Sequence, residues 1–120
     1  MLDEKQALPA FAALSQETRL RIVRLLVKAG PDGLPAGSVS EAVGASSSNA
    51  SFHLSQLEQA RLVRSRREAR SIIYIANYEA LSDLIQFLMR DCCQGRPEVC
   101  EPAVAALGSC CKPRRKRVHA

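Results

Sequence analysis

The chain has 120 residues, which suits one compact domain of ordinary size and is too short for two. Its composition, 47% hydrophobic and 24% charged, is typical of a globular protein and excludes disordered and fibrous classes. Seventeen lysine and arginine residues against twelve acidic ones give a formal net charge of +5, which favours polyanionic partners such as nucleic acid.

The amino-terminal segment MLDEKQALPA argues against secretion. Asp3 and Glu4 stand where a secretory signal carries basic residues before a long apolar run. No apolar stretch approaches the ~20 residues that a membrane-spanning helix needs. We therefore expect a cytoplasmic protein without a membrane partner.

Two helices are predicted before residue 31. Residues 3–14 carry apolar side chains at helical spacing, with Pro9 limiting or kinking the helix because proline lacks a backbone N–H. Ser15 is the predicted N-cap of the second helix, and Gly30 is its predicted left-handed C-terminal residue. The packing residues predicted for the two helices are Leu8, Phe11, Ala12, Leu14, Leu20, Ile22, Val23, Leu25, Leu26 and Val27.

Two shorter helices follow, joined by a tight turn. The first covers about residues 35–43 and ends at Gly44, and the second is capped by Ser46 and runs to about Ala60. Two short helices joined by a glycine-containing turn outline a helix-turn-helix, the motif that places its second helix in the DNA major groove. Their predicted core residues are Val39, Ala42, Val43, Ala50, Leu54 and Leu57.

Residues 62–76 predict a β-hairpin, because two apolar, largely β-branched runs flank the charged tip RSRREARS. Asn77 is the predicted cap of a last helix whose apolar residues Leu81, Leu84, Ile85 and Leu88 follow i, i+3, i+4, i+7 spacing. The predicted fold is therefore mainly α with a small β-hairpin, a winged helix-turn-helix in the order ααααββα. We expect residues 1–92 to form the DNA-binding and dimerisation domain and residues 93–120 a cysteine-containing, basic carboxy-terminal tail.

The candidate DNA-binding residues lie in two polar segments. Hydroxyls and amides near the amino end of a recognition helix reach base edges and phosphates, and the helix dipole adds attraction for phosphate. Arginines in the hairpin are suited to phosphates or to the minor groove, although either segment could instead be ordinary solvated surface. The predicted DNA-binding residues are Ser46, Ser47, Ser48, Asn49, Ser51, His53, Gln56, Arg64, Arg66, Arg67 and Arg70.

The segments LSQETRLRIVRLL and SSSNASFHLSQLEQARLVRSRREARSIIY resemble the signature segments of the ArsR/SmtB metalloregulatory repressors, over roughly residues 8–92. The most specific part is the pattern SxHLxxLxxAxLVxxxREA, which runs from Ser51 to Ala69. Two residues depart from the family pattern: Arg61 and Ala69 stand where glycine is usual, at positions that often need positive φ. The resemblance implies a repressor that binds double-stranded operator DNA.

All five cysteines lie between residues 92 and 111, and four of them form adjacent pairs that bridge to each other only with strain. Three thiolates, from Cys92, Cys93 and Cys100, suit trivalent arsenic or antimony, which favours a three-sulfur pyramidal site. This trio resembles the carboxy-terminal sensor site of one arsenic-sensing branch of the family. The zinc ligands and the helix-turn-helix cysteines of other members are missing, and we assign no ligand role to Cys110 and Cys111.

The predicted function is that of an arsenite- or antimonite-responsive transcriptional repressor, released from its operator when the metalloid inducer binds the cysteine trio. The apolar first and last helices are the predicted homodimer interface. The alternative is a redox-sensing repressor in which Cys92 or Cys93 pairs with Cys100 on oxidation. We expect no organic cofactor and no enzymatic activity, because the chain has neither a C-x-x-C at a helix start nor a second conspicuous catalytic group.

Overall fold

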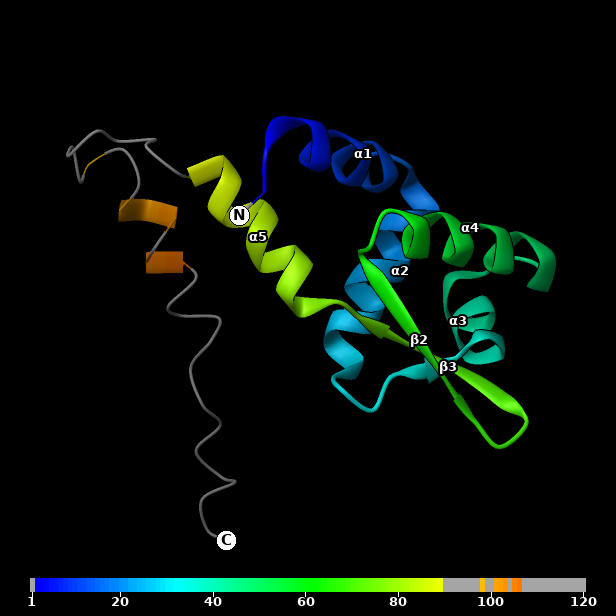
Figure 1. Ribbon diagram of the computed structural model, residues 1–120. Coiled ribbons are helices and arrows are strands. Elements are labelled where there is room, and N and C mark those ends of the chain that lie inside the picture. The colour runs from blue at the N-terminus through cyan, green and yellow to red at the C-terminus, as the bar shows by residue number, and fades with distance from the viewer. Residues whose placement is uncertain (1, 90–97, 99–100, 104, 107–120) are drawn as a thin grey trace, which may run out of the picture. The chain divides into compact units, whose positions relative to one another are not determined.

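The computed structural model describes residues 2–89, 98, 101–103 and 105–106. Contacts divide the chain into two units, Met1–Phe87 and Leu88–Ala120. In the second unit the described residues beyond 97 are helical. The predicted domain boundary, between residues 92 and 93, lies outside the described residues. The elements, in chain order, are α1 (Glu4–Leu14), α2 (Glu17–Ala29), β1 (Leu34–Pro35), α3 (Ala36–Val43), α4 (Ser47–Gln59), β2 (Val63–Glu68), β3 (Ser71–Ala76) and α5 (Tyr78–Met89) (Figure 1).

The fold is the predicted winged helix-turn-helix, with one addition. Strands β2 and β3 form the predicted hairpin, here called the wing, and the short strand β1 pairs with the other edge of β3 in a sheet of order β1-β3-β2. Strand β1 was not predicted, because a strand of two residues carries no periodicity in the sequence. Pro35 is compatible with this strand because β1 lies at the edge of the sheet.

Gly33 sits where the chain enters β1 and is required there for two reasons. Its φ is +70°, and a Cβ atom at this position would lie 2.5 Å from the carbonyl oxygen of Tyr74. Side-chain atoms of Ile73 and Ile75 would be 2.8 Å away. The close approach of β1 to β3 therefore depends on the absence of a side chain at residue 33.

Helix α1 packs through a different face from the one predicted. Its buried residues are Ala7, Ala10 and Ala13, whereas Leu8 is 58% exposed and Ala12 is also exposed. Small side chains spaced three apart provide the face that packs on the core. This face was not predicted, because the prediction was based mainly on large apolar residues. The predicted residues Phe11 and Leu14 are half-buried at the edge of that core.

Local hydrogen bonds form both ends of α1, and those at its carboxyl end correct the predicted N-cap of α2. Asp3 and Gln6 form a reciprocal capping box at the start, with distances of 2.8 and 3.0 Å, and the helix continues through Pro9. Ser15 is not the N-cap of α2: its hydroxyl donates to the carbonyl of Ala12, and Gln16 caps α2 instead.

Helix α2 buries Ile22, Val23 and Leu26, as predicted, but not every apolar residue that it carries. Leu20 and Val27 are 45% and 43% exposed. Leu25 is half-buried. The chain leaves α2 through Gly30, whose φ of +82° agrees with the prediction, although its ψ of −171° lies outside the left-handed helical region.

The helix-turn-helix has the predicted caps. Gly44 ends α3 in the left-handed conformation, and the Ser46 hydroxyl accepts a hydrogen bond from the backbone N–H of Asn49. Four of the six predicted core residues are buried: Val39, Ala50, Leu54 and Leu57. Ala42 is exposed and Val43 half-buried, because the last turn of α3 lies at the edge of the core.

Helix α5 begins as predicted, with the side-chain oxygen of Asn77 accepting from the N–H of Ala80 at 3.3 Å. Only Leu84 of its predicted apolar stripe is buried, and Ile85 is 44% exposed. No helix within the described part of the chain is long and apolar enough to cross a membrane.

Candidate nucleic-acid interface

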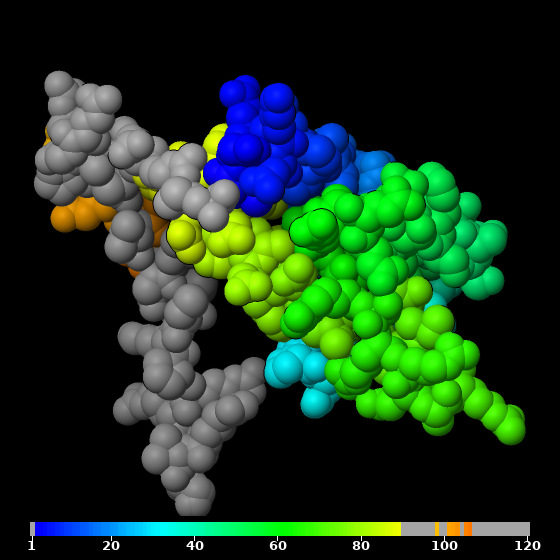
Figure 2. All heavy atoms as spheres, viewed as in Figure 1, coloured from blue at the N-terminus to red at the C-terminus, as the bar shows by residue number. Residues whose placement is uncertain are grey.

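The polar residues predicted at the start of α4 are exposed around its first turns. Ser46 occupies the N-cap position, with its hydroxyl 3.5 Å from that of Ser48. The amino-terminal end of α4 and the tip of the wing project on the same side of the first unit (Figures 1 and 2). A helix amino terminus and a basic hairpin therefore face outward together, as a recognition helix and wing require. The exposed predicted residues on α4 and its cap are Ser46, Ser47, Ser48, Asn49 and Ser51.

The wing carries most of its arginines along one strand and one arginine at its tip. Three of the predicted arginines lie on β2, while the two-residue tip is Ala69-Arg70. Because side chains alternate along a strand, Arg64 and Arg66 lie on one face of the hairpin and Arg67 on the other. Among the described residues, the side chains of Arg64, Arg67 and Arg70 have no hydrogen-bond or ion-pair partner, so their charges are available to a polyanion.

Arg66 differs from its neighbours because its guanidinium is held by the protein itself. It donates to the carbonyl oxygens of Pro31 and Asp32, at 3.3 and 3.1 Å, and pairs with Glu68 at 3.2 Å. These carbonyls belong to the turn between α2 and β1. The side chain predicted to contact DNA therefore also ties the wing to the body of the domain.

His53 is half-buried and is held by Arg19, with 3.2 Å between Nδ1 of the histidine and Nη1 of the arginine. A guanidinium can only donate, so Nδ1 accepts and the neutral ring carries its proton on Nε2. Burial, and then the nearby Arg19 charge, lower the pKa of His53 below its ordinary value of 6.5. The Nε atom of Arg19 also donates to the carbonyl of Ala13 at 2.8 Å, so Arg19 links the recognition helix to the end of α1.

Glu58 connects the far end of α4 to the wing. It accepts a 2.6 Å hydrogen bond from the hydroxyl of Ser65 on β2. Burial and the Glu58 carboxylate together raise the pKa of Tyr74 on β3 above its ordinary value.

Gln56, the last predicted DNA-binding residue of α4, is half-buried beside α1 rather than fully exposed.

Phe52 is a residue of the exposed surface of α4 that the sequence analysis missed. Its side chain is 57% exposed. Its ring meets the ring of His53 edge-on, with centroids 5.5 Å apart and 63° between the planes. Its exposure could have been predicted from the sequence, because Phe52 lies outside the apolar stripe formed by Ala50, Leu54 and Leu57.

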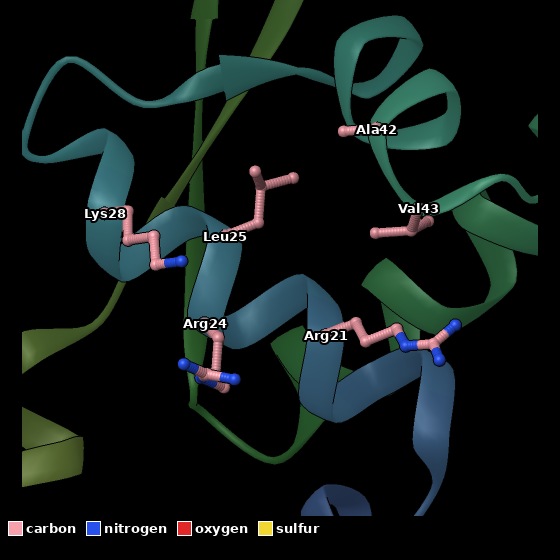
Figure 3. Close-up of a pocket in the computed structure, with 6 residues that line it drawn as sticks. All are labelled: Arg21, Arg24, Leu25, Lys28, Ala42 and Val43. Atoms are coloured by element: carbon pink, nitrogen blue, oxygen red, sulfur yellow. The ribbon is translucent and has the colours of Figure 1, made fainter.

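A second basic surface lies between α2 and α3, around a pocket of about 340 Å³ (Figure 3). Leu25 and Val43 face each other across it, and α2 contributes Arg21, Arg24 and Lys28. Arg21 pairs with Glu17 at 2.6 Å, while Arg24 and Lys28 form no ion pair within the described residues. These three cations are spaced three and four residues apart, which places them on one face of the helix. That spacing is visible in the sequence, but this basic surface was not predicted from it.

The predicted metalloid ligands Cys92, Cys93 and Cys100 lie outside the described residues, as do Cys110 and Cys111. Within the described ranges, no group of three or more histidine, cysteine, aspartate or glutamate side chains is placed to hold a metal ion.

Comparison with known proteins agrees with a helix-turn-helix regulator. Residues 14–66 match a helix-turn-helix domain family. Over 89 residues the chain is 33% identical to the HTH-type transcriptional regulator YgaV of Escherichia coli K12, covering 74% of this chain and 88% of YgaV.

Two solved structures show the same architecture. The homodimeric winged helix-turn-helix domain of Mb0332 from Mycobacterium bovis, described as a possible ArsR-family regulator, is 28% identical, with a TM-score of 0.59 over 72% of this chain and 81% of that chain. A second structure, described as a possible transcriptional regulator for arsenical resistance, is also 28% identical, with a TM-score of 0.59 and coverage of 68% and 81%. With its helix-turn-helix, its basic wing and these relatives, the chain belongs to the ArsR/SmtB family of winged helix-turn-helix transcriptional regulators.

Proposed function

We propose that this regulator is an arsenite- or antimonite-responsive repressor, which leaves its operator when the trivalent metalloid binds Cys92, Cys93 and Cys100. The observation that carries the proposal is the placement of three cysteines within residues 92–100, directly after the last helix of a DNA-binding domain. Soft thiolate ligands suit these ions better than oxygen or imidazole ligands do. The similarity to a possible regulator for arsenical resistance supports the same ligand class.

The repressor binds DNA as a homodimer in this proposal. Leu8 on α1 and Ile85 on α5 are 58% and 44% exposed in the single chain, so each of these helices has apolar surface for a partner to cover. The similar Mb0332 domain is homodimeric. A two-fold dimer would present two recognition helices to successive major grooves, about 34 Å apart.

Metalloid binding would draw the three cysteines together just beyond α5 and so act on one of the proposed dimer helices. A coupling free energy of about 1–3 kcal/mol between metalloid and DNA would weaken operator binding by about 5- to 150-fold.

The test measures operator affinity of the full, reduced chain by fluorescence anisotropy, with and without arsenite. Arsenite should weaken binding of the unaltered chain and should have little effect on Cys92→Ser, Cys93→Ser and Cys100→Ser. Cys110→Ser is the matched control and should still respond. If all three trio variants respond like the control, the proposal is wrong.

The same assay with peroxide in place of arsenite distinguishes metalloid sensing from the alternative, a redox-sensing repressor. Release by peroxide, with no response to arsenite in the reduced protein, would favour a disulfide switch. Sulfur counting by X-ray absorption on the arsenic-bound chain should give three ligands; a count of two would remove one cysteine from the proposed site.

A further inference from the structure

Helix α4 carries one large apolar side chain on its polar, exposed face. Phe52 is 57% exposed, whereas Leu54 and Leu57 of the same helix are fully buried. Helical geometry places Phe52 one turn after Ser48, on the side opposite the buried stripe. The phenyl ring therefore lies among the hydroxyl groups that this helix presents to a DNA groove.

The ring of Phe52 is supported from one side. It packs edge-on against His53, with ring centroids 5.5 Å apart. His53 is in turn held by Arg19, and Arg19 by the carbonyl of Ala13 at the end of α1. This chain of contacts orients the exposed ring before DNA arrives, which reduces the entropy lost on binding.

A phenyl ring has no hydrogen-bonding group, so it cannot read the donors and acceptors that distinguish most base pairs. Thymine is the base that presents a methyl group in the major groove, and apolar side chains such as phenylalanine recognise it. We propose that Phe52 is a specificity-determining residue that contacts the 5-methyl group of a thymine, and that His53 is its positioning residue.

This inference rests on the operator-binding part of the proposed function and is independent of metalloid sensing. The experiment therefore contains no arsenite. The full chain first selects preferred duplexes from a random-sequence library, and each thymine in the selected duplex is then replaced singly by deoxyuridine, which lacks only the methyl group. Dissociation constants for every duplex are measured at one fixed salt concentration.

At one thymine in each half-site, the replacement should weaken binding of the unaltered chain by about fourfold, the factor expected from exposing one methyl-sized group. Phe52→Ala should bind the thymine and uracil duplexes equally, and Phe52→Leu should keep part of the difference. Because Phe52 is exposed, both variants should retain the thermal midpoint of the unaltered chain.

Two further variants distinguish recognition of the thymine methyl group from overall affinity for DNA. Ser48→Ala, on the same face, should weaken both duplexes by the same factor and keep the fourfold ratio. His53→Ala should reduce the ratio itself, which a purely structural role of His53 would leave unchanged. The proposal is overturned if Phe52→Ala keeps the thymine preference, if no thymine shows one, or if the library yields no preferred sequence.

Discussion

The guanidinium of Arg66 in the wing donates a hydrogen bond to the carbonyl oxygen of Asp32, 3.1 Å away in the turn before β1. A second hydrogen bond reaches the carbonyl of Pro31. The turn is therefore joined to the wing twice, through this side chain and through the pairing of β1 with β3. The orientation of the wing depends in part on an arginine whose sequence context suggests only DNA binding.

Arg66 and Arg67 should have different effects on the salt dependence of DNA binding. Each phosphate contact contributes about 0.9 to the slope of log affinity against log salt concentration. Arg67→Ala, which removes an unpaired cation, should reduce the slope by about this amount per contact. Arg66→Ala should weaken binding with little change in slope, because its main partners are backbone carbonyls. Equal loss of slope in the two variants would contradict the anchoring role of Arg66.

Stability should depend on pH through His53. The histidine is neutral while it accepts from Arg19, and its pKa lies below 6.5 in the folded chain. Since the unfolded chain takes up the proton first, the free energy of unfolding should fall as the pH drops below 6.5 and level off below the folded-state pKa. Urea denaturation from about pH 8 to about pH 5 measures this dependence.

His53→Asn should show a smaller fall in stability over the same pH range, because asparagine offers an acceptor oxygen but does not titrate. His119→Asn is the matched control, since His119 is the only other histidine in the chain. An unchanged pH profile in His53→Asn would show that protonation of His53 is not the source of the pH dependence.

Replacement of Gly33 by alanine should destabilise the domain by about 2 kcal/mol or more, because the new Cβ would meet Tyr74 and Ile73 at a positive φ. Gly37→Ala is the matched control. Gly37 lies within α3, and a Cβ atom added there would have no atom within 4 Å. This second substitution should stabilise the domain by about 0.5–1 kcal/mol. Denaturation at one fixed protomer concentration compares the free energies of unfolding of the two variants. Similar effects of the two substitutions would rule out the close approach of β1 to β3 at Gly33.

Ala69→Gly should stabilise the wing by about 1 kcal/mol. Ala69 has a φ of +54° at the hairpin tip, a conformation that glycine adopts without the steric cost paid by a Cβ atom. The same replacement at Ala42, exposed near the end of α3, should instead lower stability by about 0.5–1 kcal/mol. A loss of stability in both variants would mean that the tip does not favour glycine.

Arg61 shows how the fold tolerates the other departure from the family pattern. It keeps a positive φ of +66° after α4, and the N–H groups of Arg61 and Leu62 donate to the carbonyls of Glu58 and Leu57. This is the Schellman arrangement, normally completed by glycine. The fully buried Leu57 and Leu62 stabilise this helix end, so the backbone keeps its path despite the arginine.

The sequence by itself was sufficient for the features set by near neighbours along the chain. The cap at Ser46, the turn at Gly44 and the buried stripe of Ala50, Leu54 and Leu57 all follow from contacts within about one helical turn. The same local signals placed the candidate recognition helix and the basic hairpin beside each other in the chain.

Only the tertiary structure decided which side chains act together. Arg19 meets His53 across 34 residues and Arg66 meets Asp32 across 34, while β1 pairs with a strand near the end of the domain. The packing of α1 through alanines likewise depends on how closely it approaches its neighbours. Periodicity reports which face of an element is apolar, but a contact between distant residues depends on the geometry of the whole fold, which no local pattern contains.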